Sequence, residues 1–176
     1  MKYVLDFDDT LYDAKRFKQQ VAADGTAHLL FTPEIWQLYD VQDYLHTDTV
    51  DWLASKQQED LFILTAAMTS DGKVVMAYQQ EKLRCSKLGA VVFEIIFSAG
   101  EKGVETAEIA SRFPPSEPII FIDDKIEQCL SVKATVPQAH CFLMVRDPSV
   151  IGEAETVRSI DVVHSLADVD AKIREL

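Results

Sequence analysis

The chain has 176 residues, of which 48% are hydrophobic, and its formal net charge is −12. This length suits one domain of ordinary size, and the hydrophobic share is enough for a sizeable core. The acidic balance argues against non-specific binding to nucleic acid or to an anionic membrane surface, so we expect neither partner. It does not exclude a phosphorylated substrate, because a few placed cations and a metal can reverse the charge locally.

The cysteines Cys85, Cys129 and Cys141 are odd in number and have neither metal-ligand nor redox spacing. We therefore expect scattered, reduced thiols, as in a cytosolic protein. No apolar stretch reaches the length of a membrane span. The N-terminus has one lysine followed by acid, which is unlike a secretory signal. A cytoplasmic location is the resulting expectation.

Short apolar runs alternate with segments of helical character along the whole chain. The apolar runs predict strands at 3–5, 61–64, 91–97, 119–122, 141–145 and 160–163. Helices are expected at 13–23, 33–44, 48–56, 73–87, 104–113, 126–134 and from 166 onward, with a polar loop at 66–72. The strand runs are continuous rather than alternating, which is typical of a parallel sheet covered on both faces. We predict one α/β domain over 1–176, with a Rossmann-like parallel sheet between helices and a small helical insert after the first strand.

Three carboxylates, Asp6, Asp8 and Asp9, follow the first predicted strand within four residues. Such a cluster is costly in a packed core, because like charges repel and desolvation disfavours the ionised form. In open α/β sheets, ligands bind at the carboxyl ends of the strands. Asp6 and Asp8 leave an extended chain on the same side, and two carboxylates aimed at one point suit Mg²⁺. The alternative is an acidic, helix-capping turn.

Polar residues also stand at the ends of the next three predicted strands. Thr65 ends the second strand, Lys102 lies a few residues past the third, and Asp123 and Asp124 end the fourth. These ends share one edge of a parallel sheet, so the side chains should converge there. Thr65 and the backbone N–H groups after it, beginning with Ala66, can donate to a phosphate, and Lys102 would offset negative charge.

Each of these residues also has an ordinary structural explanation when it is taken alone. Thr65 could cap a strand, Lys102 could be a solvated lysine, and the two acids of the fourth strand could cap the next helix. The competing cations are Lys73, Lys82 and Lys87, and we expect alanine at position 82 or 87 to leave turnover nearly unchanged. In combination and in this order, such coincidences are improbable.

Taken together, these motifs resemble those of the haloacid dehalogenase-like (HAD) hydrolase superfamily, and the resemblance covers nearly the whole chain. The first motif matches residues 6–10, Asp-Phe-Asp-Asp-Thr, after an apolar strand. Thr65, Lys102 and the pair Asp123-Asp124 match the second, third and fourth motifs. The resemblance implies a sheet in which the Asp6 strand lies between the Thr65 and Asp124 strands.

The resemblance also implies a Mg²⁺-dependent phosphoric monoester hydrolase. Asp6 would attack phosphorus and become an aspartyl-phosphate, and Asp8 would protonate the leaving oxygen and then activate water. An acid at the Asp8 position favours phosphoryl transfer over carbon–halogen cleavage. Mg²⁺ would be bound by Asp6, by the backbone carbonyl of Asp8 and by Asp124, with Asp123 as a second or outer ligand.

Members of this family carry a cap domain either after the first motif or between the third strand and the fourth motif. The insert at 12–60 is short for a full helical cap, and the segment between the third strand and the fourth motif has no room for one. We expect a minimal cap, with residues 24–31 as a flap. An open site suits a bulky phosphoester or completion by a second subunit, so substrate size, substrate identity and oligomeric state stay open. A phosphotransferase, in which a substrate hydroxyl replaces water, and a non-catalytic binding protein are the alternative functions.

Overall fold

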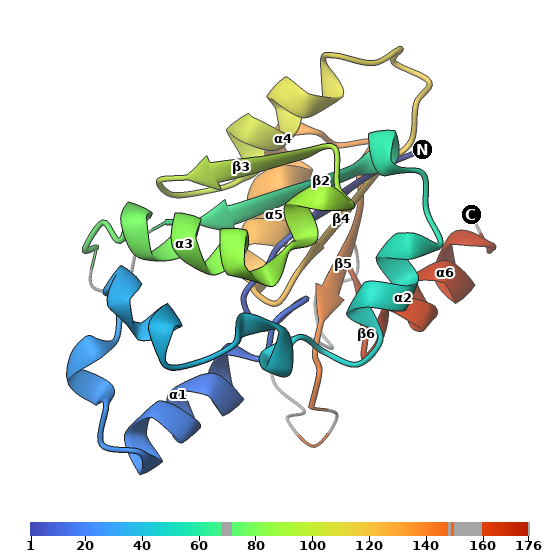
Figure 1. The fold of residues 1–176 in the computed structure, drawn as a ribbon. Helices are drawn as coiled ribbons and strands as arrows, with labels where there is room; N and C mark the ends of the chain where they lie inside the picture. The colour runs from blue at the N-terminus through green and yellow to red at the C-terminus, as the bar shows by residue number, and fades with distance from the viewer. Residues whose placement is uncertain (68–71, 148, 150–159, 176) are drawn as a thin grey trace.

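The structure is a computed structural model that describes residues 1–67, 72–147, 149 and 160–175. Six parallel strands form one sheet in the order β3-β2-β1-β4-β5-β6 (Figure 1). The strands are Lys2–Leu5 (β1), Leu61–Ala66 (β2), Glu94–Ser98 (β3), Ile119–Asp123 (β4), His140–Met144 (β5) and Asp161–Val163 (β6). The predicted α/β class is confirmed, and so is the position of the first strand between the second and the fourth. Of the predicted loop at 66–72, residues 68–71 lie outside the described residues.

Helices cover both faces of the sheet (Figure 1). The α-helices are Ala14–Ala23 (α1), Thr49–Ala54 (α2), Met76–Ser86 (α3), Gly103–Ala110 (α4), Ile126–Thr135 (α5) and Leu166–Ile173 (α6). Short 3₁₀ helices occupy Ala27–Leu29, Pro33–Gln37, Val41–Tyr44, Gln58–Asp60 and Leu88–Ala90. Among the described residues, we find no helix with both the length and the apolar character needed to cross a membrane.

Strand β1 contributes to two hydrophobic cores, one on each face of the sheet. Tyr3 and Leu5 pack in one core with side chains of α2, α3 and α6, whereas Val4 packs in the other with side chains of α4 and α5. Successive side chains of a strand point to opposite faces, so a strand covered on both sides needs an uninterrupted apolar run. Charged side chains of this strand therefore stand outside the apolar run, with Lys2 before it and Asp6 after it.

Parallel pairing brings the carboxyl ends of the central strands to the same level. Leu5 of β1 pairs with Ile63 of β2 and with Ile122 of β4. Asp6 and Asp123 are the next residues along their chains, so the pairing register sets them side by side. The N–H of Asp6 donates to the carbonyl of Ile122 at 2.8 Å. This bond holds the start of residues 6–9, the acidic loop, against β4.

Residues 12–60 depart from the predicted helical pattern in one place. The sequence predicts one helix at 33–44, but the structure has two 3₁₀ helices there, Pro33–Gln37 and Val41–Tyr44. The side chain of Asp40 accepts a hydrogen bond from the N–H of Gln42 at 2.9 Å and so begins a new helix. This local capping bond competes with continuation of the first helix.

Aromatic side chains join residues 12–60 to the main core. The ring of Phe17 on α1 lies 4.9 Å from that of Trp36 and 5.2 Å from that of Tyr44. The indole N–H of Trp36 donates to the carbonyl of Tyr78 on α3 at 3.2 Å. Residues 12–60 therefore pack directly against α3, which also lines a pocket at the carboxyl ends of the central strands.

Candidate active site at the carboxyl ends of the central strands

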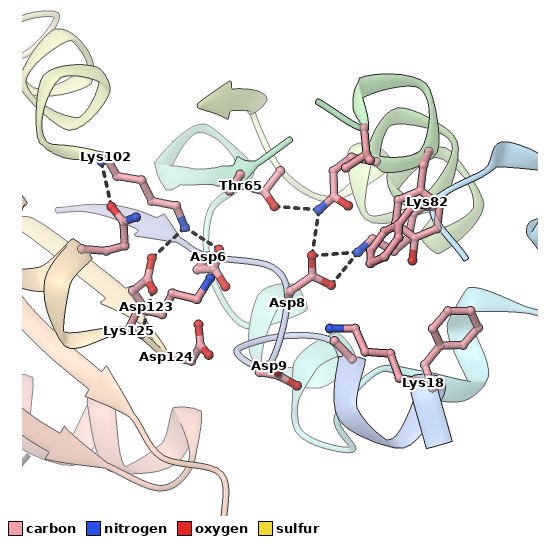
Figure 2. Close-up of a pocket in the computed structure, with 18 of the residues that line it drawn as sticks. Asp6, Asp8, Asp9, Lys18, Thr65, Lys82, Lys102, Asp123, Asp124 and Lys125 are labelled. Carbon is pink, nitrogen blue, oxygen red and sulfur yellow. Dashed lines mark hydrogen bonds and ion pairs between the residues drawn. The ribbon is translucent and has the colours of Figure 1, made fainter. Parts of the chain in front are cut away.

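A pocket of about 560 Å³ opens at the carboxyl ends of β1, β2 and β4 (Figure 2). Its wall contains every residue that the sequence singled out for chemistry: Asp6, Asp8, Thr65, Ala66, Lys102, Asp123 and Asp124. These residues come from distant parts of the chain, and the parallel sheet gathers them at one edge. The predicted convergence of polar strand ends is therefore what the fold produces.

Asp6 and Asp123 share one buried lysine. Lys102 directly precedes α4 and is 2% exposed. Its Nζ donates to Oδ1 of Asp6, and to Oδ2 of Asp123 at 2.7 Å. A Cβ on Gly103 would lie 2.6 Å from the carbonyl oxygen of Ser131, so only glycine lets α4 approach α5 this closely. Burial alone would lower the pKa of Lys102, but the charges of the two carboxylates outweigh it and raise that pKa. The ammonium group therefore stays charged.

Three carboxylates meet at this end of the pocket. Single oxygen atoms of Asp6, Asp123 and Asp124 all lie within 4.8 Å of one another. Burial, reinforced by the neighbouring carboxylates, raises the pKa of Asp6 to about 7 and that of Asp124 to about 8; Lys102 opposes the rise at Asp6. Three carboxylates around one ammonium favour a further cation, and a cluster of hard oxygen donors fits Mg²⁺.

The two neighbouring acids at the end of β4, Asp123 in the strand and Asp124 just after it, differ in what they already bind. Both oxygens of Asp123 are engaged, one by Lys102 and the other by the N–H of Lys125 at 2.9 Å. Asp124 is partly exposed and accepts no hydrogen bond within the described part of the chain. Its oxygens are therefore available to a metal ion, whereas Asp123 is suited to a supporting position.

Thr65 lies one residue before the end of β2, with its hydroxyl oriented by Gln79 of α3. The Nε2 of Gln79 donates to Thr65 Oγ1 at 2.9 Å. A hydroxyl group has one proton to donate, so acceptance from Gln79 leaves that proton for a ligand in the pocket. The N–H of Ala67 donates instead to the carbonyl of Ser98 at 3.1 Å. The expectation of free backbone N–H groups after Thr65 is therefore wrong at Ala67.

Asp8 is turned away from the three-carboxylate cluster and toward α3 (Figure 2). Its two oxygens lie 2.5 and 2.7 Å from the Nζ of Lys82, and Oδ2 also accepts from Gln79 at 2.9 Å. Burial alone would raise the pKa of Asp8, but Lys82 and Gln79 outweigh it and lower that pKa. The side chain of Lys82 is only 3% exposed, and the expectation that alanine at position 82 leaves turnover nearly unchanged did not include this burial against Asp8.

No protein-family model matches the chain, and no curated protein matches it. A haloacid dehalogenase-like family hydrolase from Xanthomonas campestris has a TM-score of 0.66 at 16% identity, over 99% of this chain and 95% of that one. A haloacid dehalogenase-like family hydrolase from Streptococcus pneumoniae has a TM-score of 0.60 at 15% identity, and the alignment covers 98% of this chain and 97% of that one. The chain has the haloacid dehalogenase-like fold. The D,D-heptose 1,7-bisphosphate phosphatase from B. bronchiseptica, complexed with magnesium and phosphate, has a TM-score of 0.59 at 16% identity, over 99% of both chains.

The HAD-like fold accounts for the order of the motifs along the chain. The first, second and fourth motifs lie at the ends of β1, β2 and β4, which are adjacent in the sheet. Lys102 reaches the same point from the start of α4. The resemblance stated from the sequence is thus confirmed at the level of the fold. The structural similarity to these neighbours covers 99% of the chain, so it includes most of residues 12–60.

Sequence reasoning missed the two residues of α3 that contact Asp8. The signal was available: Val75 and Tyr78 mark a buried stripe of this helix, and Lys82 stands seven and four residues after them. Residues at these spacings share one helix face, so a lysine there must be buried and needs a partner. Gln79 is three residues before Lys82 and lies on the same face.

Proposed function

We propose that the protein is a Mg²⁺-dependent phosphatase that hydrolyses phosphoric monoesters through an aspartyl-phosphate on Asp6. The observation that carries the proposal is the setting of Asp6: a buried carboxylate at the end of the central strand, one oxygen held by Lys102, in a pocket. Its second oxygen would attack phosphorus, and the bond between phosphorus and the leaving oxygen would break.

Charge on the transferring phosphoryl group would be stabilised from two sides. Thr65 has its hydroxyl proton free to donate to a phosphoryl oxygen, and Lys102 supplies a fixed positive charge beside Asp6. Groups that are held in place before the reaction stabilise developing charge without reorganising. The backbone of Ala66, at the end of β2, would complete the phosphate contacts.

Asp8 would act as the acid and base of the two half-reactions. It would protonate the leaving oxygen as the phosphoryl group moves to Asp6, and would then take a proton from the water that attacks the aspartyl-phosphate. That attack breaks the bond between phosphorus and Asp6 and releases inorganic phosphate. Asp8 suits this role because its carboxylate lines the pocket and is separate from the cluster around Lys102.

Mg²⁺ is the metal that the donor set fits. Asp6, the backbone carbonyl of Asp8 and Asp124 would hold it, with Asp123 in support. The ion would reduce the repulsion between the Asp6 carboxylate and an anionic substrate. The neighbour from B. bronchiseptica that is complexed with magnesium and phosphate supports this choice.

Residues 12–60 would serve as a small cap over the pocket. They contribute Phe17, Lys18 and Phe31 to its wall. A volume of about 560 Å³ falls within the usual range of small-molecule sites, about 300–1,000 Å³, which supports a phosphorylated small molecule as substrate.

The proposal is tested by turnover of p-nitrophenyl phosphate with Mg²⁺ and after chelation. We expect hydrolysis that chelation abolishes and added Mg²⁺ restores. Asp6→Asn keeps the size of the side chain but removes the nucleophile, and should lower kcat by about 10³-fold or more. Near-normal turnover by this variant would remove Asp6 from the role of nucleophile, and turnover that persists without metal would contradict the Mg²⁺ requirement.

A further inference from the structure

A buried lysine lies in the wall of the pocket opposite Lys102. Lys82, in the middle of α3, has a side chain that is 3% exposed, and its Nζ is 2.5 and 2.7 Å from the two oxygens of Asp8. Lysine is rarely buried without a partner, because desolvation of the ammonium group is costly. Both oxygens of Asp8 face this one donor, so the contact fixes the orientation of the carboxylate as well as its position.

Three aromatic rings surround the ammonium group of Lys82. Its Nζ lies 5.4 Å from the ring centre of Phe7, 5.1 Å from that of Tyr12 and 5.2 Å from that of Tyr78. Each distance is within the range of a cation–π contact. Phe7 directly precedes Asp8 along the chain, whereas Tyr78 belongs to α3. The acidic loop and the helix therefore both hold the lysine in place.

Gln79 links the Asp8 carboxylate to the end of β2. Its Nε2 donates to Asp8 Oδ2 and to Thr65 Oγ1, each at 2.9 Å, and the residue is 2% exposed. Gln79 and Lys82 are three residues apart and share one face of α3. One helix face thus orients the carboxylate that follows β1 and the hydroxyl that ends β2.

The two reacting carboxylates are each paired with a different lysine. Asp6 contacts Lys102 and Asp8 contacts Lys82, on opposite sides of the pocket (Figure 2). Asp8 lies past the end of β1, in a turn that bridges to Tyr12 and in which Asp9 has a φ of 58°, so pairing within the six-stranded sheet does not set the orientation of its side chain. Like charges repel, and the pull of Lys82 keeps the second carboxylate away from the first.

We propose that Lys82 and Gln79 are positioning residues that hold the Asp8 carboxylate on the side of the pocket where the leaving oxygen, and later the attacking water, lies. This inference rests on the proposed phosphatase function and adds two residues to its machinery. Lys82 would act on the reaction through Asp8, and Gln79 through both Asp8 and Thr65. Loss of Lys82 should therefore matter only while Asp8 can transfer a proton, whereas loss of Gln79 should keep the part of its effect that runs through Thr65.

A double-mutant cycle tests this dependence. Lys82→Met, which keeps an unbranched apolar chain among the rings, should lower kcat for p-nitrophenyl phosphate by about 10²-fold, because a misplaced group loses about that factor. In an Asp8→Asn background, the same substitution should cause no further loss. Coupled residues give such non-additive effects, whereas independent ones add. Gln79→Met leaves the ion pair intact and serves if Lys82→Met does not fold; it should lower kcat more in the wild-type background than in Asp8→Asn, where only its contact with Thr65 remains to be lost.

Lys56 provides the matched control. Its Nζ lies 2.7 Å from Asp170 and 4.6 Å from the ring centre of Trp52, its side chain is 16% exposed, and it does not line the pocket. Lys56→Met therefore removes a similar ion pair and cation–π contact, and should leave kcat unchanged. An inactive wild-type protein would overturn the proposed function together with this inference. Active wild-type protein with equal losses in both backgrounds, or with no loss at all, would overturn the inference alone.

Discussion

Lys82 Nζ lies 2.5 Å from one oxygen of Asp8 and 2.7 Å from the other, although the two residues are 74 positions apart. Asp6, two residues earlier, is held by Lys102 on the opposite side of the pocket. The site therefore separates two nearby carboxylates by giving each its own ammonium group. This separation suits two different tasks, covalent attack by one carboxylate and proton transfer by the other.

Replacement of Lys102 should impair both turnover and stability. The side chain is 2% exposed and neutralises Asp6 and Asp123, so Lys102→Met leaves two buried carboxylates without their cation. Breaking a buried ion pair from one side typically costs about 3–5 kcal/mol of the free energy of unfolding. We expect kcat to fall by about 10²-fold or more, since a fixed charge at the reacting group is lost.

Chemical unfolding and p-nitrophenyl phosphate turnover measure these two effects. Lys87→Ala is the control, because Lys87 is exposed and lies outside the wall of the pocket. If the control lost turnover and Lys102→Met kept it, the lysine of the third motif would have been assigned to the wrong residue.

The two acids at the end of β4 should differ in their effect on the metal requirement. Asp124 has oxygens available for a cation, whereas both oxygens of Asp123 already accept hydrogen bonds. Asp124→Ala should therefore raise the Mg²⁺ concentration needed for half-maximal turnover more than Asp123→Ala does. Titration of activity with Mg²⁺ measures the two values. The reverse ranking would show that Asp123 is the direct ligand.

The sheet and most of the site followed from the sequence because their determinants are local. An apolar run that ends in Asp6 and Asp8 needs burial along its length and exposure at its end, and a parallel sheet gives every such end the same edge. Lys102 was identified by its place after the third strand, and Thr65 by its place at the end of the second.

The features that escaped prediction depend on contacts between distant segments or on a single competing bond. The partnership of Lys82 with Asp8 requires α3 to pack against the loop after β1, which no local pattern states. The break between the two 3₁₀ helices depends on the hydrogen bond from the N–H of Gln42 to the side chain of Asp40. The spacing of apolar residues in this segment would by itself favour one continuous helix. The bond from the N–H of Ala67 to Ser98 depends on how far β2 and β3 stay paired.

The gain in thermal stability on Mg²⁺ binding should increase with pH. The ordinary carboxyl pKa is 3.8, but in the folded protein it is raised to about 7 at Asp6 and about 8 at Asp124. A raised pKa means that the metal-free fold binds these protons more tightly than the unfolded chain, so it loses stability as pH rises from about 4 to about 8. Mg²⁺ needs the deprotonated carboxylates, so its binding strengthens over the upper part of the same range.

Differential scanning fluorimetry with and without Mg²⁺, at about pH 6 and about pH 8.5, measures this dependence. The Mg²⁺-induced rise in Tm should be larger at the higher pH, and smaller in Asp124→Asn than in the wild-type protein. A Tm rise that is equal at both pH values would mean that these two carboxyl groups do not titrate in competition with the metal.

Asp8→Asn should separate the two half-reactions of the proposed mechanism. General acid–base help of this kind is typically worth about 10²–10⁴-fold. An alkoxide leaving group needs a proton, so with an alkyl phosphate the variant should form the aspartyl-phosphate slowly. p-Nitrophenolate leaves without one, so with p-nitrophenyl phosphate the hydrolysis step should suffer more than formation, and the phosphoenzyme should accumulate.

A burst of p-nitrophenol, close to one equivalent per protein, is therefore the expected observation in rapid-mixing kinetics of Asp8→Asn. Borohydride reduction of the trapped acyl phosphate, followed by peptide mass spectrometry, should convert an aspartate to homoserine in the peptide that contains Asp6. Asp6→Asn is the control, because it should give neither the burst nor the modified peptide. Turnover of both p-nitrophenyl phosphate and an alkyl phosphate by Asp8→Asn at the wild-type rate would instead assign the proton transfers to another group, since Asp8 could then contribute to neither half-reaction.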